Sequence, residues 1–450
     1  MSGNIKNLSK KNLSKLYEDY SSKNKILKRT MLCDYYYFRL LKDTILNLQD
    51  FYKVDWNLRS WELFIGPFLH RYVSVIYDRI QFNNYLAKKK INITLKKNHS
   101  AQLIAYNRDD FLNLIENNNW NIDLLALINI KENINNKKII FNNFLKKKVN
   151  TSKSIFKIFN LFLYKLFKSN EKILIYKPNW SSKIEVLKLY LKLKILPIKY
   201  DFNSFPSHKH KKNDLRFTDF NTKYRKLDKN EKILRNIFFD ILPEFYIEDF
   251  HLIKIESQNL PLGNNIRKVY SSLCIWEDSV LKFWLCENLK KLKLYYSQHG
   301  VNYGMTLYSY SQIFEKRLSD FYLTWGWKEE NNKNIIPFFS TKIVKKRKKI
   351  SNKNKKILIV NSKSFKYLPE NHTAIYYGYQ SKKYNEEVNS LFKLIPKKLR
   401  KNFYVKNYPN ETLDNPYNLD FSKNKFKGLN FLDSKKNILT LLKNYKYIIH

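Results

Sequence analysis

Residues 357–360 read Ile357-Leu358-Ile359-Val360, an uninterrupted aliphatic run that is typical of a strand buried on both faces. Residues 388–395 then place Val, Leu, Phe and Ile on one helix face, and residues 403–405 (Phe-Tyr-Val) predict a second strand. A short helix over residues 438–442 leads to a third strand over residues 447–449. Strands that alternate with helices predict a parallel sheet with crossover helices, so the fold class is α/β.

The same alternation is present upstream of this stretch. Residues 173–176 (Ile-Leu-Ile-Tyr) predict a strand, and the spacing of Ser182 and Glu185 is that of a capping box, which predicts a helix behind it. Further along, residues 294–297 predict a strand, residues 309–318 a helix and residues 321–325 another strand.

Shifts in composition suggest where the domains begin and end. Residues 1–30 are polar and Lys-rich and predict a loose arm or a first helix. Residues 31–340 begin with a largely helical pattern and continue into the upstream α/β alternation. Residues 341–356 contain the run Lys-Lys-Arg-Lys-Lys and are interpreted as a basic linker, with a nucleic-acid patch as the alternative. Residues 357–450 form a second α/β domain. Because the chain stops on a predicted strand, we expect this second domain to be incomplete.

The charge of the chain has two interpretations. A total of 84 Lys and Arg against 39 Asp and Glu gives a formal net charge of +45, which resembles the signature of a nucleic-acid-binding protein. Lys, Asn, Ile, Tyr and Phe are all abundant together, however, whereas Gly and Pro number only 8 and 11. This profile is typical of an AT-rich coding sequence, and the lysines are spread along the whole chain. We therefore interpret the charge mainly as a solvated surface that would also be attracted to an anionic membrane face.

Several classes of function lack their sequence signals. There is no GxxxxGK[ST], GxGxxG, HExxH or GxSxG pattern, so P-loop NTPases, dinucleotide-binding dehydrogenases, zincins and α/β-hydrolases have no support. Cys33, Cys274 and Cys286 form no CxxC pair, and we expect no disulfide framework, metal site or cofactor. The start has no apolar core of a signal peptide, and the apolar run at residues 158–167 is too short to cross a bilayer. These features predict a cytoplasmic protein.

The turn after residues 294–297 is the strongest candidate for a site. Three of the eight glycines lie between Gly300 and Gly326, and in a chain so poor in glycine this clustering indicates that the backbone needs them there. His299 follows the predicted strand, and the carboxyl ends of parallel strands face the ligand crevice. Because histidine titrates near neutral pH, His299 could act as the general base that takes a proton from a sugar hydroxyl. The alternative is a structural histidine that bonds a main-chain carbonyl.

Other polar residues could complete this site. Backbone amides at Tyr303 and Gly304 could form a nest for an anion, and Glu315 or Asp320 could bond a sugar hydroxyl or orient the histidine. Lys406 follows a predicted strand and could contact a diphosphate. A loop glycine, solvated carboxylates and a surface lysine are the structural alternatives. The predicted substrate-binding residues are Gln298, Gly300, Tyr303, Gly304, Glu315, Asp320 and Lys406.

The motif Gln298-His299-Gly300 with Tyr303-Gly304, followed by SDFYLTWGW over residues 319–327, resembles a family of transferases encoded in bacterial O-antigen and surface-polysaccharide clusters. The aromatic block at residues 61–79 and the segment 403–409 are similar to other parts of that family, which usually carries Arg where this chain has Lys406. The likeness extends over roughly residues 30–450.

This resemblance implies a GT-B-like fold, in which two Rossmann-like domains face a cleft that contains His299. Residues 31–340 would hold the acceptor and residues 357–450 the donor. It also implies transfer of a sugar or related group from a nucleotide-activated donor to a glycan or lipid-linked acceptor. We expect no obligatory metal, and the charge of the chain suggests that this cytoplasmic protein associates peripherally with the inner membrane face. Family members continue past the position of His450, so we expect a truncated donor domain. An inactive truncated remnant and a basic nucleic-acid-binding protein are the alternatives.

Overall fold

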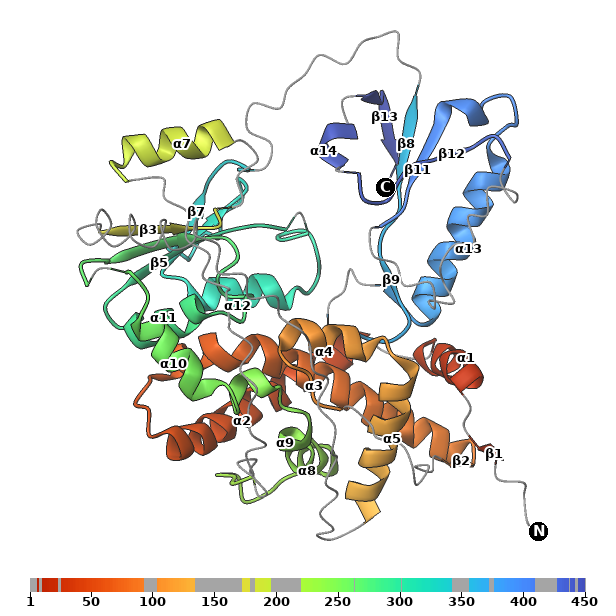
Figure 1. The fold of residues 1–450 in the computed structure, drawn as a ribbon. Helices are drawn as coiled ribbons and strands as arrows, with labels where there is room; N and C mark the ends of the chain where they lie inside the picture. The colour runs from red at the N-terminus through yellow and green to blue at the C-terminus, as the bar shows by residue number, and fades with distance from the viewer. Residues whose placement is uncertain are drawn as a thin grey trace.

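A layer of long helices supports two separate parallel sheets, which lie on opposite sides of the view in Figure 1. No membrane-crossing helix occurs among the parts of the chain that the structure describes, since none is both long and apolar enough. The computed structural model describes residues 6–7, 10–22, 26–92, 103–133, 172–178, 183–195, 220–262, 264–300, 302–341, 356–371, 376–408, 427–436, 438–441 and 444–449.

The helical layer is built around α3 (Leu58–Lys88), which is buried along most of its length because aromatic and aliphatic side chains surround it on all sides. Asn57 caps its first turn by accepting a hydrogen bond from the Ser60 amide. A Cβ at Gly66 would lie 2.8 Å from the Phe314 ring, so glycine is needed for this close packing. Around it lie α1 (Lys10–Ser21), α2 (Ile26–Tyr52), α4 (Arg108–Ile115) and α5 (Asn118–Asn133), with the short strands β1 (Lys6–Asn7) and β2 (Ile91–Asn92) paired at one end.

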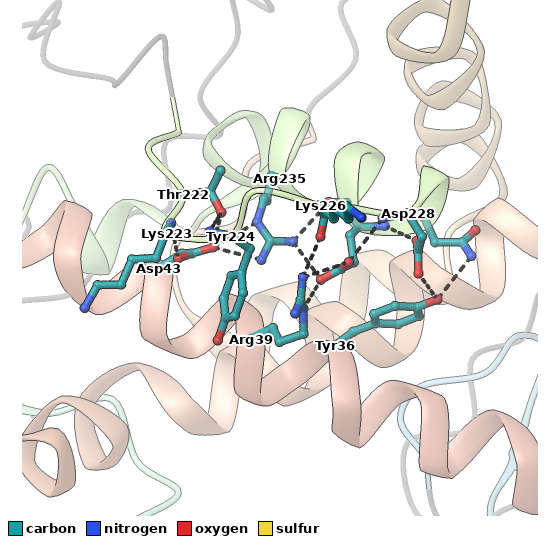
Figure 2. Close-up of polar contacts among 11 residues, drawn as sticks. Tyr36, Arg39, Asp43, Thr222, Lys223, Tyr224, Lys226, Asp228 and Arg235 are labelled. Atoms are coloured by element: carbon teal, nitrogen blue, oxygen red, sulfur yellow. Dashed lines mark hydrogen bonds and ion pairs between the residues drawn. The ribbon is translucent and has the colours of Figure 1, made fainter.

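A network of ion pairs fastens α8 (Lys229–Asn236) to the outer face of α2, as Figure 2 shows. Arg39 pairs with Glu231, and the Arg235 guanidinium lies 2.8 Å from the Asp43 carboxylate. These charges satisfy one another, so the network has the character of a structural clamp rather than of a ligand site.

The first sheet contains five parallel strands in sequence order, β3-β4-β5-β6-β7. Its core is continuous with the helical layer: Leu294, Tyr296 and the α3 side chains belong to one hydrophobic cluster. The strands are β3 (Ile173–Tyr176), β4 (Lys268–Ser271), β5 (Lys293–Ser297), β6 (Phe321–Thr324) and β7 (Ile335–Pro337). The helices between them are α7 (Lys183–Lys192), α9 (Phe238–Ile241), η1 (Glu244–Tyr246), α10 (Phe250–Gln258), α11 (Val280–Asn288) and α12 (Tyr310–Leu318), together with α8.

The second sheet has the parallel order β12-β11-β8-β13, so its first strand lies inside the sheet and the strand order reverses beside it. A reversal of this kind is the topological feature that marks ligand sites in Rossmann-type sheets. Two small clusters cover its faces. Its elements are β8 (Ile357–Val360), α13 (Tyr379–Leu394), η2 (Arg400–Asn402), β11 (Phe403–Lys406), β12 (Asn430–Phe431), α14 (Ile438–Leu441) and β13 (Tyr447–Ile449).

The segment between β8 and α13 joins this sheet to the helical layer. Here β9 (Ser364–Phe365) pairs with β10 (Tyr376–Tyr377), and the Arg71 guanidinium of α3 lies 2.9 Å from the Glu370 carboxylate. One residue on, the Asn371 side chain accepts a hydrogen bond of 3.1 Å from Arg29 Nε of α2. The second sheet is therefore anchored to the helices through buried polar contacts.

The predicted α/β class, the parallel sheets and the helical N-terminal region are confirmed. The reversal expected of a Rossmann-like half is present in the second sheet, but the described strands of the first sheet follow one another without it. The arrangement as two domains, the domain boundaries and the incomplete second domain stay predictions. Within residues 1–30 the structure forms helix α1 and the first turn of α2, and thus a helix in place of a loose arm. The linker at residues 342–355, the cap at Ser182 and the apolar run at residues 158–167 lie outside the described residues.

Candidate functional site

His299 lies in the turn that leaves the carboxyl end of β5, as predicted. Its Nδ1 atom is 3.2 Å from Oε1 of Glu315, which is fully buried, whereas the His299 side chain keeps 25% of its surface exposed. The Tyr303 ring meets the imidazole edge-on, with 5.5 Å between the ring centroids. One ring nitrogen thus faces a buried carboxylate while part of the ring reaches solvent.

Glu315 is held in place by three hydrogen-bond donors. Its Oε1 atom accepts hydrogen bonds from Trp276 Nε1 at 2.6 Å and from the Tyr303 hydroxyl at 2.9 Å, and its Oε2 atom accepts one from the Tyr322 hydroxyl at 3.0 Å. Burial, and then the charge of Glu315, raise the pKa of both tyrosines well above the ordinary value, so these hydroxyls keep their protons and act as donors. The carboxylate therefore has a fixed position behind the imidazole.

Local sequence explains how Glu315 reaches this position. Ser309 caps α12 by accepting a hydrogen bond from the Gln312 amide, and Phe314 and Leu318 pack the same helix against the core. Glu315 follows Phe314 on this buried side, so the helix carries the carboxylate toward the end of β5.

Gln298 clamps the turn from within. Its side-chain NH₂ donates to the Gly300 carbonyl at 2.7 Å, and its Oε1 atom accepts from the Trp325 amide and from Trp327 Nε1, both at 2.9 Å. The side chain is 2% exposed. Gln298 thus ties the turn that carries His299 to the loop after β6, and its predicted contact with substrate stays a prediction.

The glycines of this region serve the packing of the loop. A Cβ at Gly300 would lie 3.1 Å from the Tyr303 ring. Gly304 has a φ of +77° and donates its amide to the Gln312 side chain at 2.7 Å. The Gly304 amide, one of the two expected to form an anion nest, thus has a partner within the chain.

Asp320 lies at the opposite edge of the sheet from His299. It precedes β6, and its carboxylate accepts hydrogen bonds of 2.8 Å from the Leu294 amide, at the start of β5, and from Arg59. Burial opposes ionisation of Asp320, but the hydrogen bonds from Arg59 and Leu294 outweigh it and lower the pKa. The structure therefore does not bring Asp320 to His299.

Lys406 ends β11 of the second sheet, whereas His299 follows a strand of the first. Its ammonium donates to the Ser434 carbonyl at 2.7 Å, and the residue is only 5% exposed. Lys406 thus lies at a strand end, as predicted, but its ammonium group contacts a backbone carbonyl.

Sequence reasoning missed the tryptophan and tyrosine donors around Glu315. Trp276 lies in the turn before α11, where nothing in the local sequence marks it. Tyr322 carries a weak signal, since the alternation along β6 points Tyr322 and Thr324 inward.

The loop after His299 rests on the helical layer through a second polar cluster. The Tyr308 hydroxyl donates to Asp34 at 2.6 Å, and the His70 ring stacks on Tyr310. Burial, and then the charges of Arg71 and Arg317, lower the pKa of His70 well below its ordinary value. His70 is therefore a neutral packing residue, and His299 is the partly exposed histidine of this region.

The arrangement of His299 and Glu315 suits proton transfer. A carboxylate 3.2 Å from Nδ1 orients an imidazole, which is the geometry that general-base histidines use. Metal ligands do not gather here: among the described residues no group of three or more His, Cys, Asp or Glu side chains could hold an ion.

A family model described as LIC12162 family transferase matches residues 3–449. No curated protein and no solved structure matches the chain. The family match spans both sheets, the helical layer and the turn that carries His299. The chain therefore belongs to the LIC12162 family of transferases.

Proposed function

We propose that the protein transfers a sugar or related group from a nucleotide-activated donor to a hydroxyl of a surface-polysaccharide or O-antigen acceptor, with His299 as the general base. The observation that carries this proposal is the contact between His299 Nδ1 and the buried carboxylate of Glu315, which accepts three hydrogen bonds. A histidine oriented by a fixed carboxylate is the arrangement that general-base catalysis requires.

In this reaction the acceptor hydroxyl gives its proton to His299 Nε2 while its oxygen attacks the anomeric carbon of the donor. The bond from that carbon to the diphosphate oxygen breaks, and the nucleoside diphosphate leaves with the electron pair. Glu315 stabilises the imidazolium, which later returns the proton to solvent. Gln298 holds the turn in register during this transfer.

The second sheet is the better place for the donor nucleotide. Ligands of open α/β sheets bind at the carboxyl ends of the strands where the strand order reverses, and here the reversal lies between β8 and β13. Asn361 follows β8 at that edge, and its amide donates to the Lys406 carbonyl at 2.9 Å. Lys406 stands at the same edge. We place the reaction at the cytoplasmic face of the inner membrane, where such donors and lipid-linked acceptors would meet.

The test is a turnover screen with a panel of nucleotide-activated sugars and a lipid-linked glycan acceptor, comparing wild type with His299→Ala. We expect the substitution to lower kcat by about 10²–10⁴-fold, because it removes the base. The partly exposed position of His299 should leave the melting temperature close to that of wild type. His251→Ala, at an exposed histidine on α10, is the matched control and should turn over normally. Unchanged turnover in His299→Ala would exclude this role for the histidine.

A further inference from the structure

The helix α7 presents an apolar stripe to solvent. The exposed fractions are 66% for Ile184, 45% for Leu187 and 65% for Leu191. Spacings of three and four residues place these side chains on one helix face. Figure 1 shows α7 on the side of the first sheet that is opposite the helical layer.

The other side of the helix already packs against the protein. Val186, Leu189 and Tyr190 lie on that side and are half-buried. The exposed stripe is therefore a second apolar face in addition to the one that packs. Contiguous apolar surface of this kind is unfavourable in water and marks a contact surface.

Basic residues accompany the apolar stripe. Lys188 and Lys192 flank it on the solvent side, and Lys194 lies two residues past the end of the helix; all three are exposed. The acidic residue of the helix, Glu185, lies 3.6 Å from Lys188. The edge of the stripe is thus positively charged, as is the chain as a whole, with its formal net charge of +45.

We infer that α7 docks the protein onto an anionic lipid bilayer. Leucine and isoleucine side chains in one stripe, with lysines beside them, are the features of a helix that lies in the membrane interface. The apolar side chains would enter the acyl boundary, and the ammonium groups would reach the lipid phosphates. At ten residues the helix is about 15 Å long, so it lies on the membrane and does not cross it.

Charge complementarity favours a lipid surface over a second copy of the chain. Two copies that met through α7 would bring their lysines together, whereas a bilayer with anionic headgroups neutralises them. The inference does not depend on the transfer reaction, since the helix carries neither His299 nor Glu315.

The experiment is co-flotation of the full chain with vesicles of phosphatidylglycerol mixed with phosphatidylcholine, and with phosphatidylcholine alone. We expect binding to the anionic vesicles only. Ile184→Ser with Leu187→Ser and Leu191→Ser should weaken this binding at least about tenfold, because the apolar contact is lost. Lys188→Glu with Lys192→Glu should weaken it by a similar factor, since each basic residue near the surface contributes several-fold.

The matched control removes two exposed leucines elsewhere, Leu394→Ser with Leu399→Ser, which are 79% and 49% exposed. This variant should bind vesicles like wild type. Equal binding by the control and the α7 triple variant would overturn the inference, and so would absence of vesicle binding by wild type. If wild type is a dimer that binds no vesicles and the α7 triple variant is a monomer, the stripe would instead be the contact between two copies of the chain. None of these readouts depends on turnover, so failure here is distinguishable from failure of His299 as the base.

Discussion

The two parallel sheets differ in how they are buried. In the first sheet, Leu294 and Tyr296 of β5 are fully buried in a core continuous with the helical layer. The second sheet has two small clusters of its own, and its strand β13 is open to solvent, with Ile448 50% exposed. A histidine that transfers protons must be fixed, whereas a region that admits and releases a nucleotide must open. The difference in burial thus agrees with a base on the first sheet and a donor site on the second.

The strongest test of a base on the first sheet and a donor site on the second is the substitution Glu315→Gln. The amide has the shape of the carboxylate but only one acceptor oxygen, whereas the three donors contact both oxygens of Glu315. The other position becomes an NH₂ group that faces Trp276, Tyr303 or Tyr322. We expect turnover to fall about 10²-fold or more while donor binding persists. The measurement is kcat together with the Kd of the donor. Glu329→Gln, at a partly exposed carboxylate that pairs with Lys316, is the control and should retain turnover.

Loss of donor binding equal to the loss of turnover in Glu315→Gln would contradict the division. It would mean that the first sheet holds the nucleotide as well as the base.

The next effect concerns stability. Leu294→Ala and Leu358→Ala remove equivalent, fully buried leucines from the first and second sheets. Such changes cost about 2–5 kcal/mol, and the cost rises where the surroundings are unable to collapse. We expect Leu294→Ala near the top of that range and Leu358→Ala near the bottom, because the small cluster around Leu358 can relax. Urea unfolding followed by circular dichroism measures both, and equal costs would remove the distinction between the sheets.

A smaller effect should appear with pH in the layer beneath the site. Burial keeps the pKa of His70 below that of the unfolded chain, so the unfolded state binds the extra proton as pH falls below about 6.5. Stability contributed by His70 is therefore complete above that pH and declines below it, by up to about 1.4 kcal/mol per pH unit. Urea unfolding at pH 7.5 and 5.5 tests this. His70→Phe keeps the stacking on Tyr310 and should flatten the dependence, and an unchanged slope would rule out His70 as its source.

The smallest effect is expected at Lys406. Lys406→Met removes a hydrogen bond to the Ser434 carbonyl that is worth about 1–2 kcal/mol and shifts the loop at the donor edge. We expect a several-fold rise in donor KM with kcat nearly unchanged. Lys401→Met, at an exposed lysine of η2 just before β11, is the control. A fall in kcat at constant KM would instead place Lys406 at the reacting atoms.

The sequence predicted the strands that are most apolar and the turn at their ends. The runs at residues 173–176 and 357–360 became β3 and β8, and His299 emerged at the end of β5. The strand β4 was missed, because Lys268-Val269-Tyr270-Ser271 is short and half polar and owes its place to the neighbouring strands.

The site was only partly predictable for the same reason. The proximity of His299 and Glu315 was foreseen as one of two options for orienting the imidazole, and the structure selects Glu315 over Asp320. Trp276 enters from 39 residues upstream, a contact that depends on tertiary packing and leaves no local pattern. The two hydrogen bonds that the Trp325 amide and Trp327 Nε1 donate to the Gln298 side chain likewise depend on the fold and leave no pattern in the local sequence.

The central claim is that Glu315 favours a proton on Nδ1 of His299, so that Nε2 accepts the proton of the acceptor hydroxyl. Nitrogen-15 NMR of the histidine rings at pH 8, with the His299 signals assigned by their loss in His299→Ala, tests it most directly. The account predicts a protonated Nδ1 and an unprotonated Nε2, and a change in this preference in Glu315→Gln. A proton on Nε2 in wild type would contradict it, because no base would then face the acceptor.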